Sequence, residues 1–285
     1  MKEIVVISGK GGTGKTVVTA ALAYLAKNKV MADCDVDAAD LHLLLRPQIK
    51  EEGKFRSGAT AVVDKNKCIA CGKCLEVCRF SAVYSDFTID PISCEGCAFC
   101  SNVCPASAIQ MKENLSGQWF VSDTRFGPFV HARLGIAEEN SGKLVALVKK
   151  KAKELAKKQK ASFIIVDGSP GIGCPVIASL SGADCAIVVT EPTLSGLADA
   201  KRVIKVAKHF RIPVKLIINK FDLNLEVNEK IEKYCKEDNI DILGKLPFDK
   251  SVVEAITAQK TLPEAASDNI KKIVANIWFK LNSQL

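Results

Sequence analysis

Short apolar runs alternate with segments of helical periodicity along most of the chain. Runs rich in Val, Ile and other apolar residues predict buried strands at 3–8, 30–33, 162–167, 183–190, 214–220 and 242–246. Segments with apolar positions three and four residues apart predict helices at 17–27, 195–210 and 225–238. Strands that alternate with helices predict an α/β fold with a doubly wound, mostly parallel sheet.

Two further stretches carry a charged or amphipathic pattern. Residues 149–160 hold seven lysines in twelve positions, which predicts the solvated face of a helix ahead of the strand at 162–167. Residues 269–281 place four apolar side chains on one helical face: Ile273, Ile277, Trp278 and Leu281. Such a face either packs on the sheet or docks to a membrane. We expect packing on the sheet, without a membrane partner.

The composition is that of a folded, globular chain. Of the 285 residues, 48% are hydrophobic and 25% are charged, which excludes a disordered or fibrous protein. At about 150 residues per domain, the length predicts one large domain or two smaller ones. No run approaches the roughly 18 apolar residues of a membrane span, and the first apolar run leads into glycines without a signal-peptide cleavage site. We therefore expect a cytoplasmic protein, in which cysteines are more often metal ligands than disulfides.

Eight of the twelve cysteines form an internal repeat. Each group reads C-x2-C-x2-C-x3-C, and the second is the first displaced by 26 residues: Cys68, Cys71, Cys74 and Cys78, then Cys94, Cys97, Cys100 and Cys104. The correspondence continues past the cysteines, where Ser81 and Ala82 recur as Ser107 and Ala108. This is the spacing of a bacterial-type ferredoxin that carries two [4Fe-4S] clusters.

The spacing also predicts how the ligands are shared. Three cysteines on one loop can bind one face of a cubane, whereas the fourth points away and binds the other cluster. We therefore assign one cluster to Cys68, Cys71, Cys74 and Cys104, and the other to Cys94, Cys97, Cys100 and Cys78. Arg79 stands where a proline is expected, as Pro105 is in the second group, which removes no ligand. A pair of zinc sites is the alternative, although zinc sites typically pair two CxxC knuckles.

A glycine-rich loop joins the first predicted strand to the first predicted helix. Its residues have the P-loop spacing in the required strand–loop–helix context: Gly9, Lys10, Gly11, Gly12, Thr13, Gly14, Lys15 and Thr16. The glycines allow backbone N–H groups to converge on phosphate oxygens at a helix N-terminus. We expect Lys15 to reach the β and γ phosphates and the Thr16 hydroxyl to bind Mg²⁺.

Lys10 is a second lysine ahead of the usual one. The loop KGGTGKT resembles the deviant Walker A motif of the MinD/Mrp/nitrogenase-iron-protein ATPases, in the SIMIBI class of P-loop NTPases. The resemblance implies an ATPase that binds ATP or ADP with Mg²⁺ and forms a nucleotide-sandwich homodimer. Lys10 then reaches the phosphates of the partner; a solvated loop lysine is the alternative.

Carboxylates follow two of the predicted strands, as they do in that family. Asp33 ends one strand, and the resemblance implies that Asp35 of the Asp-x-Asp pattern orients the attacking water and the Mg²⁺ shell. Asp167 ends another strand ahead of a glycine-rich turn, and resembles a Walker B aspartate that holds Mg²⁺ through water. Asp37 and Asp40 are extra carboxylates that could instead cap the next helix.

Two later residues match the adenine-binding positions of the same family. Asn219 ends the strand at 214–220 and resembles the asparagine that reads adenine, with an incidental strand-end Asn as the alternative. Pro247, in the segment KLPFD, resembles the loop that closes over the base through main-chain contacts.

The two motifs predict one domain inserted in another. The resemblance covers 1–60 and 113–285 as the ATPase domain, with an inserted α+β ferredoxin domain at 61–112. The whole is similar to MinD-superfamily ATPases that contain a ferredoxin domain. Residues 122–134, with His131, either couple the clusters to the Asp-x-Asp segment, which resembles the family's switch I, or form a plain structural loop.

Four cysteines lie outside the repeat. Cys185 is expected to be a core residue, and neither Cys34 nor Cys235 has an evident partner. Cys174 follows Asp167 as a cluster-binding cysteine does in the nitrogenase iron protein. A cluster shared between subunits also needs an upstream cysteine, and 138–144 has none. The lack of a CxxC after Cys104 counts against a pure Mrp-type scaffold.

The main functional hypothesis is nucleotide-gated electron transfer through two clusters to an unknown redox partner. The alternatives are an iron–sulfur assembly or carrier ATPase that serves an acceptor protein, and a MinD-like positioning protein. The net charge of +8 favours a nucleic-acid partner only until the clusters are counted. Two clusters of about −2 each lower it to about +4, so no nucleic-acid partner is expected.

Overall fold

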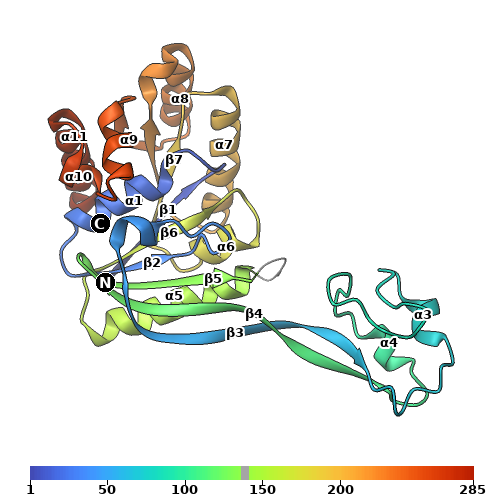
Figure 1. Cartoon of the computed structure of the whole chain (residues 1–285). Coiled ribbons are helices and arrows are strands. Elements are labelled where there is room, and N and C mark those ends of the chain that lie inside the picture. The colour runs from blue at the N-terminus through green and yellow to red at the C-terminus, as the bar shows by residue number, and fades with distance from the viewer. Residues whose placement is uncertain (136–140) are drawn as a thin grey trace. The chain divides into compact units, whose positions relative to one another are not determined.

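The computed structural model describes residues 1–135 and 141–285 of the chain (Figure 1). The elements in chain order are β1 (Lys2–Ser8), α1 (Lys15–Leu25), β2 (Lys29–Asp33), α2 (Leu41–Leu45), β3 (Gln48–Val63), α3 (Lys73–Val77), α4 (Phe99–Asn102), β4 (Ile109–Thr124), β5 (Gly127–Leu134), α5 (Ser141–Lys158), β6 (Phe163–Pro170), α6 (Cys174–Leu180), β7 (Cys185–Thr190), α7 (Leu194–His209), β8 (Val214–Asn219), the 3₁₀ turn η1 (Phe221–Leu223), α8 (Leu225–Glu237), β9 (Asp241–Leu246), α9 (Lys250–Thr257), α10 (Leu262–Ala265) and α11 (Asp268–Ser283).

The strands form one sheet in the order β3-β4-β5-β2-β6-β1-β7-β8-β9. From β5 to β9 the neighbouring pairs are parallel. The expected mostly parallel α/β sheet is therefore confirmed. β1 lies inside the sheet between β6 and β7; the chain goes from β1 to β2 on the β6 side, and after β6 it crosses to β7 on the other side of β1. In open α/β sheets, ligands bind outside the carboxyl ends of the strands at such a point.

Helices pack on both faces of the sheet, as a doubly wound fold requires. α1, α10 and α11 pack on one face, and α5 to α8 pack on the other. The alternation of strand residues explains this arrangement: Ile4 and Val6 of β1 join the core beneath α1 and α11, whereas Val5 and Ile7 point to the opposite side. The continuous apolar runs in the sequence are strands that are buried on both faces.

The amphipathic C-terminal segment packs as expected. α11 buries Ile277 and Leu281, and Ile273 and Trp278 pack at the edge of the same core cluster. The apolar face of this helix is thus covered by the sheet. Among the residues that the structure describes, no helix is both long enough and apolar enough to span a membrane.

One lysine of the basic segment 149–160 departs from the expected solvated face. Lys149 of α5 is buried, and its Nζ lies 2.6 Å from Glu3 Oε1 of β1. The same ammonium donates to the carbonyl groups of Ser179 and Ser181 at the end of α6. The expectation is wrong at this position because Lys149 neutralises a buried glutamate and binds free carbonyls at a helix end.

The chain divides into two compact units. The sheet unit comprises Met1–Gly53, Trp119–Arg133 and Ser141–Leu285. The cysteine unit comprises Lys54–Gln118 and Leu134–Asn140, of which 136–140 lie outside the described residues. All eight repeated cysteines belong to the cysteine unit.

The strands β3, β4 and β5 have no counterpart in the predicted elements. Most residues of β3 from Gln48 to Lys54 are exposed, so the segment shows no alternation of apolar and polar side chains. The segment 122–134 proves to be the end of β4 and all of β5, joined by a short turn. Part of the stretch 138–144, where an upstream cysteine was sought, lies outside the described residues.

Candidate functional site

The glycine-rich loop joins the end of β1 to the start of α1. Gly12 and Gly14 have left-handed backbone, with φ of 79° and 89°. Gly14 is the N-cap of α1, so no side chain occupies the first N–H groups of the helix. The loop borders a cavity of about 440 Å³ at the carboxyl edge of the sheet. An anion in this cavity would meet unoccupied N–H groups and the positive end of the helix dipole.

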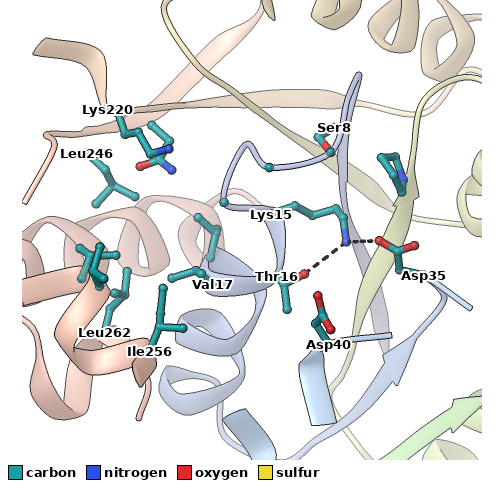
Figure 2. A pocket seen from close by; sticks show the side chains of 18 of the residues that line it. Ser8, Lys15, Thr16, Val17, Asp35, Asp40, Lys220, Leu246, Ile256 and Leu262 are labelled. Atoms are coloured by element: carbon teal, nitrogen blue, oxygen red, sulfur yellow. Dashed lines mark hydrogen bonds and ion pairs between the residues drawn. The ribbon is translucent and has the colours of Figure 1, made fainter. Parts of the chain in front are cut away.

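Lys15 lies between two buried carboxylates, those of Asp35 and Asp167. Its Nζ is 2.9 Å from Asp167 Oδ1. It is 3.2 Å from Asp35 Oδ2, a contact that Figure 2 shows. Burial alone lowers the pKa of an ammonium, but the charges of Asp167, Asp35 and Asp33 outweigh it and raise the pKa of Lys15. Lys15 therefore stays protonated at neutral pH.

The three carboxylates share this single buried ammonium. Burial, followed by the charge of Asp167, raises the pKa of Asp33 well above its ordinary value. Burial also raises the pKa of Asp35, against the opposing effect of Lys15. Asp33 Oδ1 accepts the Asp35 N–H at 3.0 Å, which fixes the loop after β2. The site thus holds an excess of negative charge that a divalent cation would neutralise.

Asp167 connects this group to two hydroxyls of α1. Thr16 Oγ1 donates to Asp167 Oδ2 at 2.7 Å, and Thr19 Oγ1 donates to Asp167 Oδ1 at 2.9 Å. β2 and β6 are neighbours with Asp33 paired to Asp167, which explains why residues so far apart in sequence meet. Thr16, Asp35 and Asp167 are oxygen donors, the ligand type that Mg²⁺ prefers.

Several predicted residues line the cavity and others do not. Those on its wall are Gly11, Gly12, Gly14, Lys15, Thr16, Asp35 and Asn219. Gly9, Lys10, Thr13, Asp167 and Pro247 are not on the wall. Gly9 is instead required for packing, because a Cβ there would clash with the backbone of Asp199 in α7. Pro247 comes directly after Leu246, the last residue of β9, which does line the cavity.

Several residues on the cavity wall were not predicted to lie there. Asp40, interpreted as a possible helix cap, makes no side-chain cap bond on α2 and lies on the cavity wall. Val252, Val253 and Ile256 of α9 form an apolar part of the wall together with Leu262. No sequence signal marks these apolar residues, because they come from helices more than 200 positions after the loop. Thr19 was missed as well, although its place one helical turn after Lys15 could have indicated it.

Asn219 and Lys10 contact different elements: Asn219 contacts the glycine-rich loop, and Lys10 contacts the start of α7. Asn219 Nδ2 donates to the Thr13 carbonyl at 2.9 Å, and a Cβ at Gly14 would clash with the Asn219 amide. The Nζ of Lys10 lies 3.3 Å from Ser195 Oγ and 3.5 Å from Thr193 Oγ1, at the start of α7. Lys10 is thus held only by weak contacts to hydroxyl groups near the surface.

The two cysteine groups fold as similar loops. α3 begins at position 73 and α4 at position 99, which is the displacement of 26 residues seen in the sequence. Left-handed backbone recurs at the same displacement: φ is 53° at Ala70 and 64° at Gly96, and 78° at Gly72 and 62° at Ala98. The duplication therefore extends from the sequence to the backbone conformation.

Cysteines of the two groups come together in the cysteine unit. One small hollow is lined by three cysteines of the first group and the last of the second: Cys68, Cys71, Cys74 and Cys104. The Ala108 N–H lies 3.3 Å from Cys104 Sγ and donates to it. Burial raises the pKa of the Cys100 thiol, and the charges of three nearby cysteines add to this: Cys94, Cys97 and Cys78. Each set holds a fourth member from the other group.

The four cysteines outside the repeat differ in exposure. Cys34, Cys185 and Cys235 are buried, whereas Cys174 is exposed at the start of α6. Within residues 1–135 and 141–285, no three His, Cys, Asp or Glu side chains are placed to hold one metal ion.

The fold and the loop define a P-loop nucleotide-binding class of protein. Residues 4–262 match the model of the CobQ/CobB/MinD/ParA nucleotide binding domain. The chain belongs to this family.

Relatives with several functions match nearly the whole chain. An uncharacterized protein of Methanocaldococcus jannaschii is 35% identical, covering 98% of this chain and 96% of the relative. The septum site-determining protein MinD of Bacillus subtilis is 27% identical, covering 89% and 79%. An iron-sulfur cluster carrier protein of M. jannaschii is 24% identical, covering 99% and 86%.

Solved structures agree with the fold. MinD of Aquifex aeolicus superposes with a TM-score of 0.59 at 19% identity, covering 99% of this chain and 98% of that one. MinD of Pyrococcus horikoshii, in complex with Mg-ADP, gives 0.56 at 19% identity, covering 98% and 95%. At these identities the likeness shows the fold alone.

Proposed function

We propose that the chain is an ATP-binding and ATP-hydrolysing iron–sulfur protein, in which nucleotide state gates electron transfer through two [4Fe-4S] clusters to a redox partner. The observation that carries the proposal is that three cysteines of the first group lie together with the last cysteine of the second group, in a chain of the MinD/ParA family. We place the protein in the cytoplasm, with the ferredoxin domain at 61–112 and the ATPase domain at 1–60 and 113–285.

The nucleotide site has the charges that phosphoryl transfer needs. Lys15 would bind the β and γ phosphates, and the hydroxyl of Thr16 would coordinate Mg²⁺ together with Asp35 and Asp167. In support, Lys15 already pairs with both carboxylates in a buried site. MgATP would replace these pairs by pairing Lys15 with phosphates and the carboxylates with Mg²⁺. Asn219 and the chain at Pro247 would contact adenine at the other end of the cavity. A protein of the same fold, MinD of P. horikoshii, was solved in complex with Mg-ADP, which supports the proposal of a magnesium nucleotide.

Lys10 would act on the nucleotide of a second subunit. Its ammonium is exposed and does not line the cavity of its own chain. A homodimer with the nucleotides between the subunits would let Lys10 neutralise charge on the partner's phosphates. We expect Lys10→Ala to abolish dimer-dependent ATPase activity and to leave nucleotide binding largely intact. Retained turnover in that variant would exclude the sandwich-dimer mechanism.

The cysteine sets fit the ligands of [4Fe-4S] clusters. Each set supplies four thiolates from two loops, and the backbone N–H of Ala108 donates to one of the sulfurs, which is a common way to tune a cluster. Cys68, Cys71, Cys74 and Cys104 would hold one cluster, and Cys94, Cys97, Cys100 and Cys78 the other. When bound, each cluster supplies one-electron transfer.

A stack of aromatic rings within the sheet unit supports coupling between the segment that carries Asp35 and β4, the strand that follows the cysteines. The His131 ring of β5 stacks on Phe129 at 4.6 Å and on Phe120 of β4 at 5.0 Å between centroids. His42 of α2, the helix after Asp35, lies 6.5 Å from His131 and nearly parallel to it. A change at Asp35 on nucleotide binding would therefore have a packed route to β4.

The test compares oxidation of the reduced protein with and without nucleotide. Dithionite-reduced protein is mixed anaerobically with an excess of a one-electron acceptor, and the visible absorbance of the clusters is followed. We expect MgATP to change the oxidation rate of the wild type and not that of Lys10→Ala. An equal rate with and without MgATP in the wild type would exclude gating.

Cluster delivery is the second candidate function. The cluster-carrier relative and the exposure of Cys71 and Cys97 favour it. A carrier would lose its iron to a chelator and would fill an apo acceptor protein when ATP is added. Clusters that resist the chelator while the acceptor stays empty would exclude delivery and leave electron transfer.

A further inference from the structure

The turn that follows β8 connects three loops around the nucleotide cavity. Asn219 Nδ2 donates to the carbonyl of Thr13 in the glycine-rich loop. Lys220 Nζ lies 2.6 Å from Glu191 Oε1, in the loop after β7. Two positions on, Asp222 Oδ1 accepts the N–H of Phe248, in the loop after β9, at 2.7 Å. The third contact has no part in the function proposed above.

The contact of Asp222 lies two residues ahead of the first residue of α9, Lys250. Phe248 lies between Pro247 and Asp249, and Asp249 is the N-cap of α9. Asp249 accepts the N–H of Ser251 at 2.8 Å and the hydroxyl of Ser267 at 2.6 Å. The segment 247–249 is thus held at Phe248 by Asp222 and at Asp249 by its own contacts.

The helix that follows this segment, α9, carries much of the apolar part of the cavity wall. Val252, Val253 and Ile256 of α9 line the cavity. In Figure 2, Leu246, Ile256 and Leu262 gather at one end of the cavity, whereas Lys15, Thr16 and Asp35 gather at the other. A nucleotide has the same polarity, with a flat base at one end and charged phosphates at the other. The apolar end therefore suits the base.

We propose that Asp222 is a positioning residue for base recognition, which rests on the nucleotide-binding function proposed above. Asp222 does not line the cavity, so it acts through Phe248 by holding the loop after β9 and the wall of α9 in place. A hydrogen bond that a carboxylate accepts from a backbone N–H is stronger than a neutral one. Its loss would release the wall that meets the base and leave the phosphate-binding loop unchanged.

The test separates the base from the phosphates. Calorimetry on the full chain measures the affinities of MgATP and of Mg²⁺ with inorganic tripolyphosphate, which has no base. For Asp222→Ala we expect MgATP binding weaker by about tenfold, from the loss of one charge-assisted hydrogen bond, and tripolyphosphate binding within about twofold of wild type. Asp222→Asn keeps an acceptor oxygen, so its MgATP affinity should stay within about threefold of wild type.

A matched control and the thermal midpoints exclude a general loss of structure. Asp268 is an exposed carboxylate at the start of α11 that does not line the cavity, so Asp268→Ala should change neither affinity. Asp222 is itself exposed, so thermal midpoints close to wild type are expected for every variant.

Four results would overturn the inference. These are an unchanged MgATP affinity in Asp222→Ala, an equal loss for tripolyphosphate, failure of Asp222→Asn to retain binding, and a wild-type preference for GTP over ATP that Asp222→Asn removes. The last would place Asp222 directly on a guanine, whose two adjacent N–H groups pair with a carboxylate. A wild type that binds tripolyphosphate but not MgATP would overturn the proposed function as well.

Discussion

Replacing Lys15 with methionine tests the charge balance of the nucleotide site. Methionine has a similar length but no charge, so Lys15→Met leaves the surrounding carboxylates without their ammonium. The side chains involved are deeply buried, with exposed fractions of 7% for Lys15, 1% for Asp167 and 11% for Asp35. Solvent therefore cannot compensate for the lost charge.

The expected loss is about 3 kcal/mol in the free energy of unfolding at pH 7.5. Removing one partner of a buried ion pair costs about 3–5 kcal/mol. We expect the lower end because the pKa of Asp33 is already well above its ordinary value, so this carboxyl can take up a proton and limit the repulsion.

The loss should shrink as the pH falls. Without Lys15, the raised pKa values of Asp33 and Asp35 rise further in the folded state and stay ordinary in the unfolded state. As the pH falls, the folded variant then binds more protons than the unfolded variant. Its free energy of unfolding therefore rises relative to wild type, by at most about 1.4 kcal/mol per pH unit for each group that takes up a proton. The difference between variant and wild type should be clearly smaller at pH 5.5 than at pH 7.5.

Urea unfolding without nucleotide, followed by tryptophan fluorescence, measures this. Trp119 and Trp278 are the two tryptophans of the chain, and both lie in the sheet unit. Lys10→Met is the matched control from the same loop, and because the Lys10 ammonium makes only long contacts to hydroxyl groups near the surface, it should cost less than about 0.5 kcal/mol. The reasoning is refuted if Lys15→Met is as stable as Lys10→Met at pH 7.5, or if its deficit grows on acidification.

Two further predictions concern the sheet unit. Burial, and then the charge of His42, lower the pKa of His131 to about 4, so between about pH 6.5 and pH 4 the unfolded chain takes up this proton and the folded chain does not. Wild type should therefore lose about 2 kcal/mol of unfolding free energy from pH 7 to pH 5 relative to His131→Phe, and parallel pH profiles in urea titrations would contradict this. A Cβ on Gly53 would clash with the Trp119 ring, so Gly53→Ala should cost about 1–3 kcal/mol. In a Trp119→Phe background the same change should cost less than about 1 kcal/mol, and an equal cost in both backgrounds would show that the indole is not the cause.

Much of the nucleotide site could be predicted because local sequence determines it. A buried strand, glycines and a helix must bring the phosphate loop to one edge of the sheet. The carboxyl ends of parallel strands share that edge, which is why Asp33, Asp35 and Asp167 meet Lys15. The grouping of the cysteines was expected from their repeat; that they bind clusters stays a prediction.

Other features depend on tertiary contacts that no local pattern encodes. The apolar wall from Val252 to Ile256 reaches the cavity only because α9 folds back over the edge of the sheet. From Gln48 to Glu52, β3 has consecutive exposed residues, so its sequence does not alternate there. Lys149 belongs to a lysine-rich segment, and its burial depends on partners far away in the sequence, namely Glu3 of β1 and the carbonyl groups of Ser179 and Ser181.

The central claim is that nucleotide at the sheet unit is sensed by two clusters in the cysteine unit. The most direct measurement is EPR of the anaerobically purified, dithionite-reduced protein with and without MgATP, with iron and sulfide counted on the same sample. We predict about eight iron and eight sulfide per chain, and a spectrum that changes with MgATP in wild type but not in Lys15→Met. Zinc in place of iron and sulfide, or a spectrum that MgATP leaves unchanged, would contradict the account.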